Sequence, residues 1–175
     1  MRRDLSDDEF ERSLSIARHS LWRWEQQPAY WVGYERQQFD EFLAGRPRPP
    51  TEAPDLANWM NQVAEQTGQG MTIGRVRIVD DPITDYQRWM RWMDRWNRAA
   101  GEVIDYLGRP RLDRIGPPPF APAADWWFVD EERLVIMHFD GTYRRVGAEV
   151  LVDEPEIKLA GRWRDVVIAE ARAAR

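Results

Sequence analysis

The sequence contains no cysteine, only two histidines and a single lysine, Lys158, among its 25 basic residues. Without cysteine, disulfides, thiolate nucleophiles and cysteine-ligated zinc or iron–sulfur sites are excluded. His19 and His138 share no local spacing typical of metal ligands, so we expect neither a metal site nor a cofactor. The near-complete use of arginine over lysine is explained by the codon usage of a GC-rich genome at least as well as by phosphate recognition, and we interpret it first as codon usage.

Serine, phosphate-binding loops and long apolar runs are also scarce. All serines lie in the first twenty residues, and none has the strand–turn–helix context of a nucleophile elbow. The stretch GQGMTIG precedes a predicted strand and lacks the lysine of a P-loop. No window has the length and apolarity of a signal peptide or membrane span, so we expect a cytoplasmic protein without a membrane partner. These absences disfavour several enzyme classes and leave open whether the protein is an enzyme.

The composition that remains is that of an ordinary globular protein. Hydrophobic residues make up 43% and charged residues 31% of 175 residues, which predicts one domain spanning residues 1–175. Ten tryptophans predict a core rich in indole rings. The net charge of −5 disfavours non-specific binding to nucleic acid, because that affinity comes mainly from neutralising phosphates.

Hydrophobic periodicity and turn residues predict an alternation of helices and strands. The predicted helices cover residues 4–19, 35–44, 56–67, 80–101 and 153–174, and the predicted strands cover 71–79, 102–107, 126–129, 133–139 and 144–152, with a hairpin over 21–34. Residues 1–19 are then a helical N-terminal extension. This order predicts an α/β fold with a mixed β-sheet flanked by helices, an N-terminal hairpin and a C-terminal helix. On that last helix we expect Leu159, Trp163, Val166 and Val167 to share the inner side.

The stretch DYQRWMRWMDRW alternates arginine with tryptophan and methionine. At about 100° per residue on a helix, the two kinds of side chain separate onto opposite faces. The apolar face carries Tyr86, Trp89, Met90, Met93, Trp96 and Ala100 with Trp92 at its border, and the opposite face carries Arg88, Arg91, Arg95 and Arg98. A core helix with a solvated arginine face is the favoured interpretation. A strip that binds an anion or nucleic acid, and a surface for a partner protein, are the alternatives.

Three weaker patterns suggest a ligand site. Arg75 and Arg77 share a strand face and, with Arg88 after the next turn, form a possible anion clamp; alternatively they cover the sheet or pair with nearby aspartates, Asp80, Asp81 and Asp85. His138 and Asp140 lie two apart at a strand end, as a general base and its orienting acid would, or as an ordinary strand-to-turn pair. The stretch DWWFVD could line an apolar pocket, or its tryptophans could fill a core or an interface.

Several longer motifs resemble an actinobacterial family known as a domain of unknown function. They are RVRIVDDPITDYQRW, AGEVI, DWWFVDEERLVIMHFDG, GAEVLVDEPE and a terminal WRD, together with WRWEQQPAYWV and FDEFLAG. The resemblance covers about residues 20–172. The positions that match the family's recognisable residues are Arg75, Arg77, Pro82, Asp85, Tyr86, Arg88, Trp127, Asp130 and His138. All of these except Pro82 are our candidate ligand-binding residues, and the catalytic residues, if any, stay unassigned. The charged N-terminal extension and the longer proline loop before Asp125 depart from the pattern.

The resemblance implies a partner rather than a reaction. Members of that family are often encoded beside Xre-type helix-turn-helix regulators. A looser likeness connects the order of elements to phospholipase-D-like sensor domains, although the stretch HFD lacks the lysine of the His-x-Lys motif of that superfamily.

Two hypotheses on function follow. The first is a non-enzymatic regulatory or interaction protein that acts with a helix-turn-helix transcriptional regulator. The alternative is a small-molecule-binding protein or enzyme whose ligand is anionic and partly aromatic or apolar, with Arg75, Arg77 and Arg88 at the anionic group, Trp127 at the apolar part and His138 in proton transfer.

Overall fold

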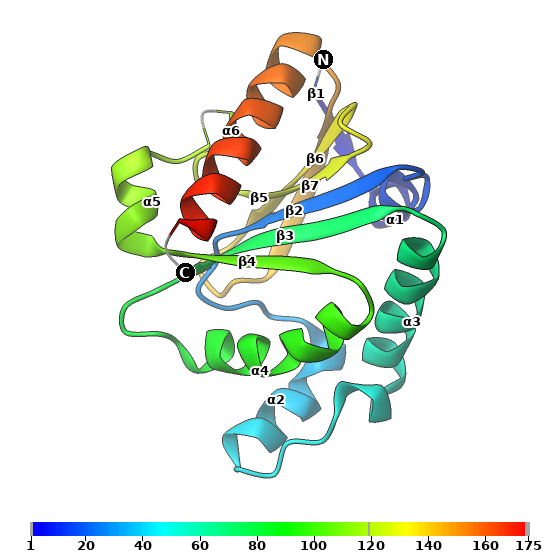
Figure 1. The fold of residues 1–175 in the computed structure, drawn as a ribbon, viewed down its shortest axis with the longest axis vertical. Coiled ribbons are helices and arrows are strands. Elements are labelled where there is room, and N and C mark those ends of the chain that lie inside the picture. The colour runs from blue at the N-terminus through cyan, green and yellow to red at the C-terminus, as the bar shows by residue number, and fades with distance from the viewer. Residues whose placement is uncertain (1, 119, 174–175) are drawn as a thin grey trace.

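A mixed, seven-stranded β-sheet forms the centre of the computed structural model, which describes residues 2–118 and 120–173 (Figure 1). The strands lie in the order β1-β7-β6-β5-β2-β3-β4. Their bounds are β1 Arg2–Leu5, β2 Ser20–Glu25, β3 Thr72–Val79, β4 Val103–Gly108, β5 Asp125–Val129, β6 Arg133–Phe139 and β7 Arg145–Leu151. The helices are α1 Asp7–Ser15, α2 Arg36–Leu43, α3 Pro54–Gly68, α4 Asp85–Ala99, α5 Arg109–Ile115 and α6 Glu154–Arg172.

Strand β2 lies where two kinds of pairing meet. It runs parallel to β3, which is parallel to β4, and antiparallel to β5 on its other side. Helices α2 and α3 lie in the connection from β2 to β3, and α4 connects β3 to β4. After α5 the chain crosses to the far side of β2 and builds the antiparallel strands β5, β6 and β7, which β1 extends at the edge. The crossover places β2 at a topological switch point of the sheet.

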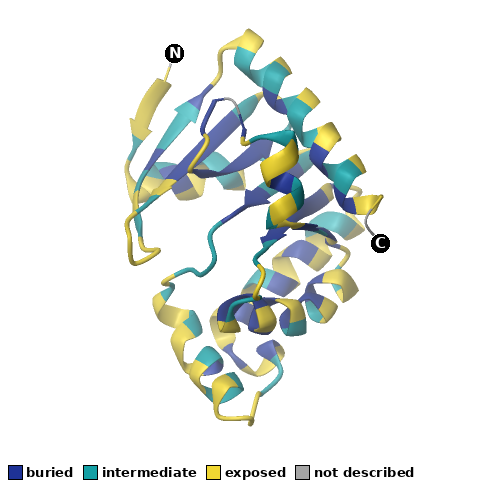
Figure 2. Ribbon diagram, turned by 90° about the vertical axis from the view of Figure 1, so that its left-hand side faces the viewer, coloured by how far each residue is buried: buried dark blue, intermediate teal, exposed yellow. Residues whose placement is uncertain are grey.

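Helices cover both faces of the sheet. Helices α5 and α6 lie against one face, and α1, α3 and α4 against the other (Figure 1). The central strands and the inward sides of the helices are buried, while the edge strand β1 and the outward sides of the helices are exposed (Figure 2). Because both faces are covered, the central strands carry buried side chains in both directions.

The core beneath α6 is built largely from indole rings. Trp22 and Trp126 on neighbouring strands approach with ring centroids 5.0 Å apart, and Trp24 meets Trp163 of α6 edge to face at 4.6 Å. Phe128 and the aliphatic side chains of β3 and β4 complete this layer. The expected indole-rich core is therefore present, and it holds one face of the sheet against α6.

Most predicted elements are confirmed: the mixed sheet with flanking helices, the last three strands, and the C-terminal helix. The separation of side chains on α4 is confirmed as well, since its four outer arginines, Arg88, Arg91, Arg95 and Arg98, are all exposed. Within the described residues, no helix combines the length and apolarity needed to cross a membrane.

The N-terminal region differs in detail from the prediction. The helix expected over 4–19 is shorter, and it follows β1, whose four residues pair with β7 at the sheet edge without any apolar alternation. Of the hairpin expected over 21–34, the first strand is β2. Residues 26–32 then leave the sheet, because Gln26 N–H donates to the Asp125 carboxylate and Trp31 N–H donates to the Tyr143 carbonyl.

The C-terminal half contains two smaller differences. Helix α5 was not predicted, because its seven residues, which include Pro110 and precede a proline-rich loop, show too little periodicity. On α6 the predicted inner residue Val166 is exposed, whereas Ala160 and Ala171 are buried. Small side chains there allow α6 to lie close to the sheet.

We expect Trp24→Ala to lower the free energy of unfolding by about 3–5 kcal/mol, because this fully buried ring fills the layer between the sheet and α6. The matched control is Trp31→Ala, whose ring is 45% exposed and whose loss should cost about 1 kcal/mol or less. Urea unfolding followed by circular dichroism measures both. Equal losses in the two variants would contradict the assignment of Trp24 to the core.

Candidate ligand-binding site

The register of the parallel strands brings charged side chains together. Arg23 of β2 lies beside Arg75 of β3, and Glu25 lies beside Arg77. Side chains alternate between the faces of a strand. These four therefore point away from the tryptophan layer, toward the face covered by α1, α3 and α4.

This charged group is buried. Arg75 is 4% and Arg77 is 6% exposed. Their ion-pair partners are Glu25, Glu102 and Asp94 rather than the predicted Asp80, Asp81 and Asp85. Glu25 lies at the centre, with its carboxylate 3.0 Å from Nη1 of Arg23, 3.2 Å from Nη1 of Arg75 and 2.8 Å from Nη1 of Arg77. One carboxylate thus holds three guanidinium groups in one place.

Two further carboxylates complete the group. Arg75 Nε donates to Glu102 Oε1 at 2.5 Å. Arg77 Nη2 lies 3.2 Å from Asp94 Oδ1 on α4 as an ion pair, although the two atoms are not aligned for a hydrogen bond. Asp94 also accepts a hydrogen bond from the Tyr106 hydroxyl. We call the set Arg23, Glu25, Arg75, Arg77, Asp94 and Glu102 the charged floor.

The electrostatics of the charged floor keep Glu25 and Arg77 ionised. Burial alone raises the pKa of a carboxyl group, but the guanidinium groups of Arg23, Arg77 and Arg75 outweigh burial and lower the pKa of Glu25 to about 2. Burial likewise opposes the charge on Arg77, yet Asp94 and Glu25 raise the pKa of Arg77 above its usual value. The charged floor therefore pairs three guanidinium groups on the sheet with three carboxylates, of which Glu25 lies on β2 and Asp94 and Glu102 lie on α4 and in the turn after it.

A cavity of about 360 Å³ opens above the charged floor. Its walls combine aromatic rings with charged groups, and the rings include Trp59 from α3, Tyr86 from α4, Trp127 from β5, and Tyr30 from the segment after β2. The Trp127 ring lies 4.9 Å from the Arg23 guanidinium carbon and 6.0 Å from that of Arg75, both measured to the ring centroid. A volume of this order and a mostly apolar lining with a few polar groups are typical of small-molecule sites.

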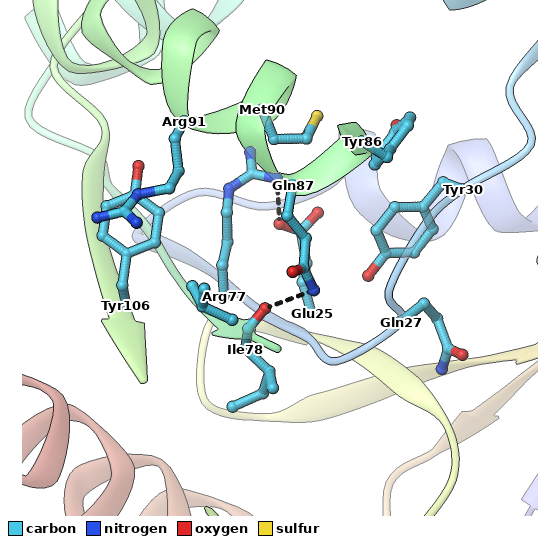
Figure 3. A pocket seen from close by; sticks show the side chains of 11 residues that line it. Glu25, Gln27, Tyr30, Arg77, Ile78, Tyr86, Gln87, Met90, Arg91 and Tyr106 are labelled. Carbon is cyan, nitrogen blue, oxygen red and sulfur yellow. Dashed lines mark hydrogen bonds and ion pairs between the residues drawn. The ribbon is translucent and has the colours of Figure 1, made fainter. Parts of the chain in front are cut away.

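A smaller cavity of about 20 Å³ adjoins the first one near the carboxyl ends of β2 and β3 (Figure 3). Arg77 extends from β3 toward α4 between Tyr106 and Glu25, and Met90 and Tyr86 face it from the helix (Figure 3). Gln87 closes this end by donating to the Ile78 carbonyl at 3.2 Å. The space is of the size that holds a single water molecule.

Two tyrosine–carboxyl pairs fix the cavity wall. The Tyr30 hydroxyl donates to Asp125, and the Tyr86 hydroxyl donates to Glu35 at 2.5 Å. Burial raises the pKa of Asp125 to about 6, with Arg23 and the Tyr30 hydrogen bond opposing the shift. Burial also raises the pKa of both tyrosines well above the usual value. Both phenols therefore stay neutral, and Asp125 anchors the segment that carries Tyr30.

The cavity gathers half of the residues predicted from the sequence. Arg75, Arg77, Tyr86 and Trp127 all line it. Asp85 and Arg88 instead pair with each other at 2.7 Å on the outer surface of α4, with both side chains more than half exposed. The proposed clamp therefore lacks Arg88. The third arginine beside Arg75 and Arg77 at the cavity is Arg23.

The other predicted residues lie elsewhere. Asp130, in a positive-φ turn between β5 and β6, accepts hydrogen bonds from the backbone N–H groups of residues 18–20. His138 is half exposed and its Nε2 lies 3.1 Å from Glu149. Asp140 accepts hydrogen bonds from Thr142 and Arg144 within its own turn. Each of these groups has a local structural partner outside the cavity.

Sequence reasoning missed Arg23, Glu25 and Tyr30. The alternation in LWRWE placed Arg23 and Glu25 on one face, which was the available signal. Nothing in the sequence showed that β3 would lie beside this strand in parallel.

A comparison with family models matches residues 8–175 to a family described as a domain of unknown function, DUF6879. The chain belongs to this family. The match includes every residue of the charged floor and starts ahead of the region in which the sequence motifs suggested the resemblance. No curated protein matches the sequence.

We expect Glu25→Gln to lower the free energy of unfolding by about 3–5 kcal/mol, because the change leaves the buried guanidinium groups of Arg75 and Arg77 and the partly buried one of Arg23 around a neutral amide. Glu154→Gln is the matched control, since its exposed partner Lys158 is i+4 on the same helix and such pairs contribute little. Urea unfolding measures both. A Glu25 variant as stable as the control would show that the guanidinium groups do not depend on this carboxylate.

Asp125 should give stability a distinctive pH dependence. Its pKa of about 6 in the folded chain, against 3.8 as the ordinary value, means that the folded state binds more protons between these values, so stability falls as pH rises through this window. Between about pH 4.5 and about pH 7 the contribution lost is about 2 kcal/mol. Asparagine does not titrate, so Asp125→Asn removes this loss. From about pH 4.5 to about pH 7 the free energy of unfolding of the variant should therefore rise relative to that of the wild type by about 2 kcal/mol. A difference that does not change with pH would contradict the raised pKa.

Proposed function

We propose that the protein binds a small organic molecule with a flat, largely apolar body in the cavity above the charged floor. The observation that carries this proposal is a cavity of about 360 Å³ whose lining combines aromatic rings with three clustered arginines, of which Arg75 and Arg77 are buried and Arg23 is partly buried. Purely structural burial of so many charges is costly, because each ion must be removed from water. A binding role gives a reason for keeping them.

The position of the cavity supports the same proposal. It lies on β2, where the parallel and antiparallel parts of the sheet meet. Open α/β sheets commonly bind ligands where the strand order reverses. The aromatic rings of Trp59 and Trp127 stand 6.1 Å apart in an edge arrangement, and they present ring surface on which a flat molecule can pack.

The proposal assigns binding and no reaction. His138, the residue expected to transfer a proton, does not line the cavity. Two of the tyrosine hydroxyls that line it, those of Tyr30 and Tyr86, already donate to Asp125 and Glu35. A sensor or carrier of a small molecule therefore fits the side chains better than a catalyst does.

Partnership with a helix-turn-helix regulator, which the family resemblance implies, stays a separate proposal. Co-purification of the two proteins at micromolar concentration tests it directly. The two proposals are compatible if the protein binds a small molecule and then acts on the regulator. In that case, complex formation with the regulator should differ with and without a bound compound.

We expect Val32→Trp to abolish binding of flat aromatic compounds, because Val32 lines the cavity and an indole ring there fills the space. Val146→Trp is the control, since Val146 is 61% exposed and is absent from the cavity lining. Thermal unfolding with a panel of naphthalene and indole derivatives measures binding as a rise in Tm. Wild type and control should respond alike. Equal responses in the Val32 variant, or no response in wild type, would contradict the proposal.

A further inference from the structure

We infer that the ligand carries a single carboxylate, held between Arg23 and Arg75 with its aromatic body against Trp127. This inference rests on the proposed binding function and names the chemical class of the ligand as an aromatic monocarboxylic acid. Its basis is the hydrogen-bonding capacity left open at the charged floor.

Each of the two arginines uses only part of its guanidinium group within the protein. Arg23 contacts Glu25 through Nη1, and Arg75 contacts Glu102 through Nε and Glu25 through Nη1. Within residues 2–118 and 120–173, neither Nη2 atom has a hydrogen-bond or ion-pair partner, and neither is among the buried atoms closed off from solvent. Both residues line the cavity. The open polar groups of these arginines are therefore N–H donors.

The placement of the two donors suits a planar acceptor. Arg23 and Arg75 are direct neighbours on parallel strands, which run about 4.8 Å apart. Both guanidinium groups lie near the same Trp127 ring. A carboxylate has two oxygens in one plane and accepts charge-assisted hydrogen bonds from neighbouring guanidinium edges, and an aromatic ring attached to it would then lie along Trp127.

The acceptors around the cavity do not compete for this role. Glu25 Oε1 is shared by Arg23 and Arg75, and Glu35 already accepts from Tyr86. Glu25 Oε2, Glu102 Oε2 and Asn97 Oδ1 accept no hydrogen bond, but these atoms are buried, and Glu25 Oε2 forms an ion pair with Arg77. The other carboxylate that lines the cavity is Glu11 of α1, an exposed residue, so the open polar groups on the sheet side of the cavity are those of Arg23 and Arg75.

The charge balance distinguishes a carboxylate from a phosphate. Three guanidinium groups and three carboxylates cancel within the charged floor, and Arg145 at the cavity wall pairs with Asp7 at 2.8 Å. A dianionic phosphate would bring two charges into a site that offers no uncompensated cation. A monoanion brings one, which two charge-assisted hydrogen bonds can stabilise.

Three compounds with one ring system separate these possibilities: 2-naphthoate, 2-naphthamide and 2-naphthyl phosphate. Isothermal titration and saturation-transfer NMR with the full chain measure their affinities. We expect the carboxylate to bind at least about tenfold more tightly than the amide and more tightly than the phosphate. Arg23→Gln should remove the preference for the carboxylate over the amide, and Arg88→Gln, at the outer surface of α4, should retain it.

The outcomes separate the headgroup from the cavity. Equal affinity for naphthoate and naphthamide overturns the carboxylate and leaves the cavity as the binding site. Tighter binding of the phosphate overturns the charge argument in favour of a dianion. Failure of all three compounds overturns both proposals. Because the comparison of compounds uses the wild-type protein, the inference stays testable even if Arg23→Gln does not fold.

Discussion

The contact of one buried carboxylate with three guanidinium groups is the interaction on which the rest of this structure depends. Glu25 joins β2 to two arginines of β3 and to its own neighbour Arg23. Isolated charges in a protein interior are strongly unfavourable, and they persist only when each has partners of the opposite sign. Without Glu25 the parallel pairing of β2 and β3 would bring Arg23, Arg75 and Arg77 together with no carboxylate shared among them.

The charged floor also determines what surrounds it. Asp94 and Glu102 come from α4 and the turn after it, so the crossover helix is bound to the sheet by ion pairs in addition to apolar contacts. The guanidinium groups in turn present flat surfaces to Trp127, Trp59 and Tyr30, and such cation–π contacts gain strength when they are removed from water. The aromatic walls and the charged floor therefore stabilise one another.

The fold was largely predictable because its main elements follow from local patterns. Helix α4 has a capping box at Thr84 and a clear apolar face, and β5 to β7 show apolar runs separated by turn residues. The short edge strand β1 and helix α5 were missed because four and seven residues carry too little periodicity. The path of residues 26–32 was missed because it depends on Asp125, which is distant in sequence.

The site was predictable only in part for a similar reason. Arg75, Arg77, Tyr86 and Trp127 were identified, because the alternation of β3 and the family motifs pointed to them. The burial and the ion-pair partners of these residues were not predicted, because whether an arginine is buried depends on which strand lies beside it. Arg23 and Glu25 belong to the site because β2 pairs with β3 in parallel register. Arg88 lies outside it, because its position in the first turn of α4 directs it toward solvent and Asp85.

Arginine side-chain NMR tests the central claim, that the charged floor is a fixed, buried network open to a ligand at Arg23 and Arg75. In ¹⁵N–¹H spectra assigned by substitution, Arg75 and Arg77 should give slowly exchanging Nε–H signals with separate Nη resonances, whereas Arg88 should show the averaged signals of an exposed side chain. Adding 2-naphthoate should shift the signals of Arg23 and Arg75 and leave those of Arg88 unchanged. Averaged, rapidly exchanging signals for Arg75 and Arg77 would contradict the account.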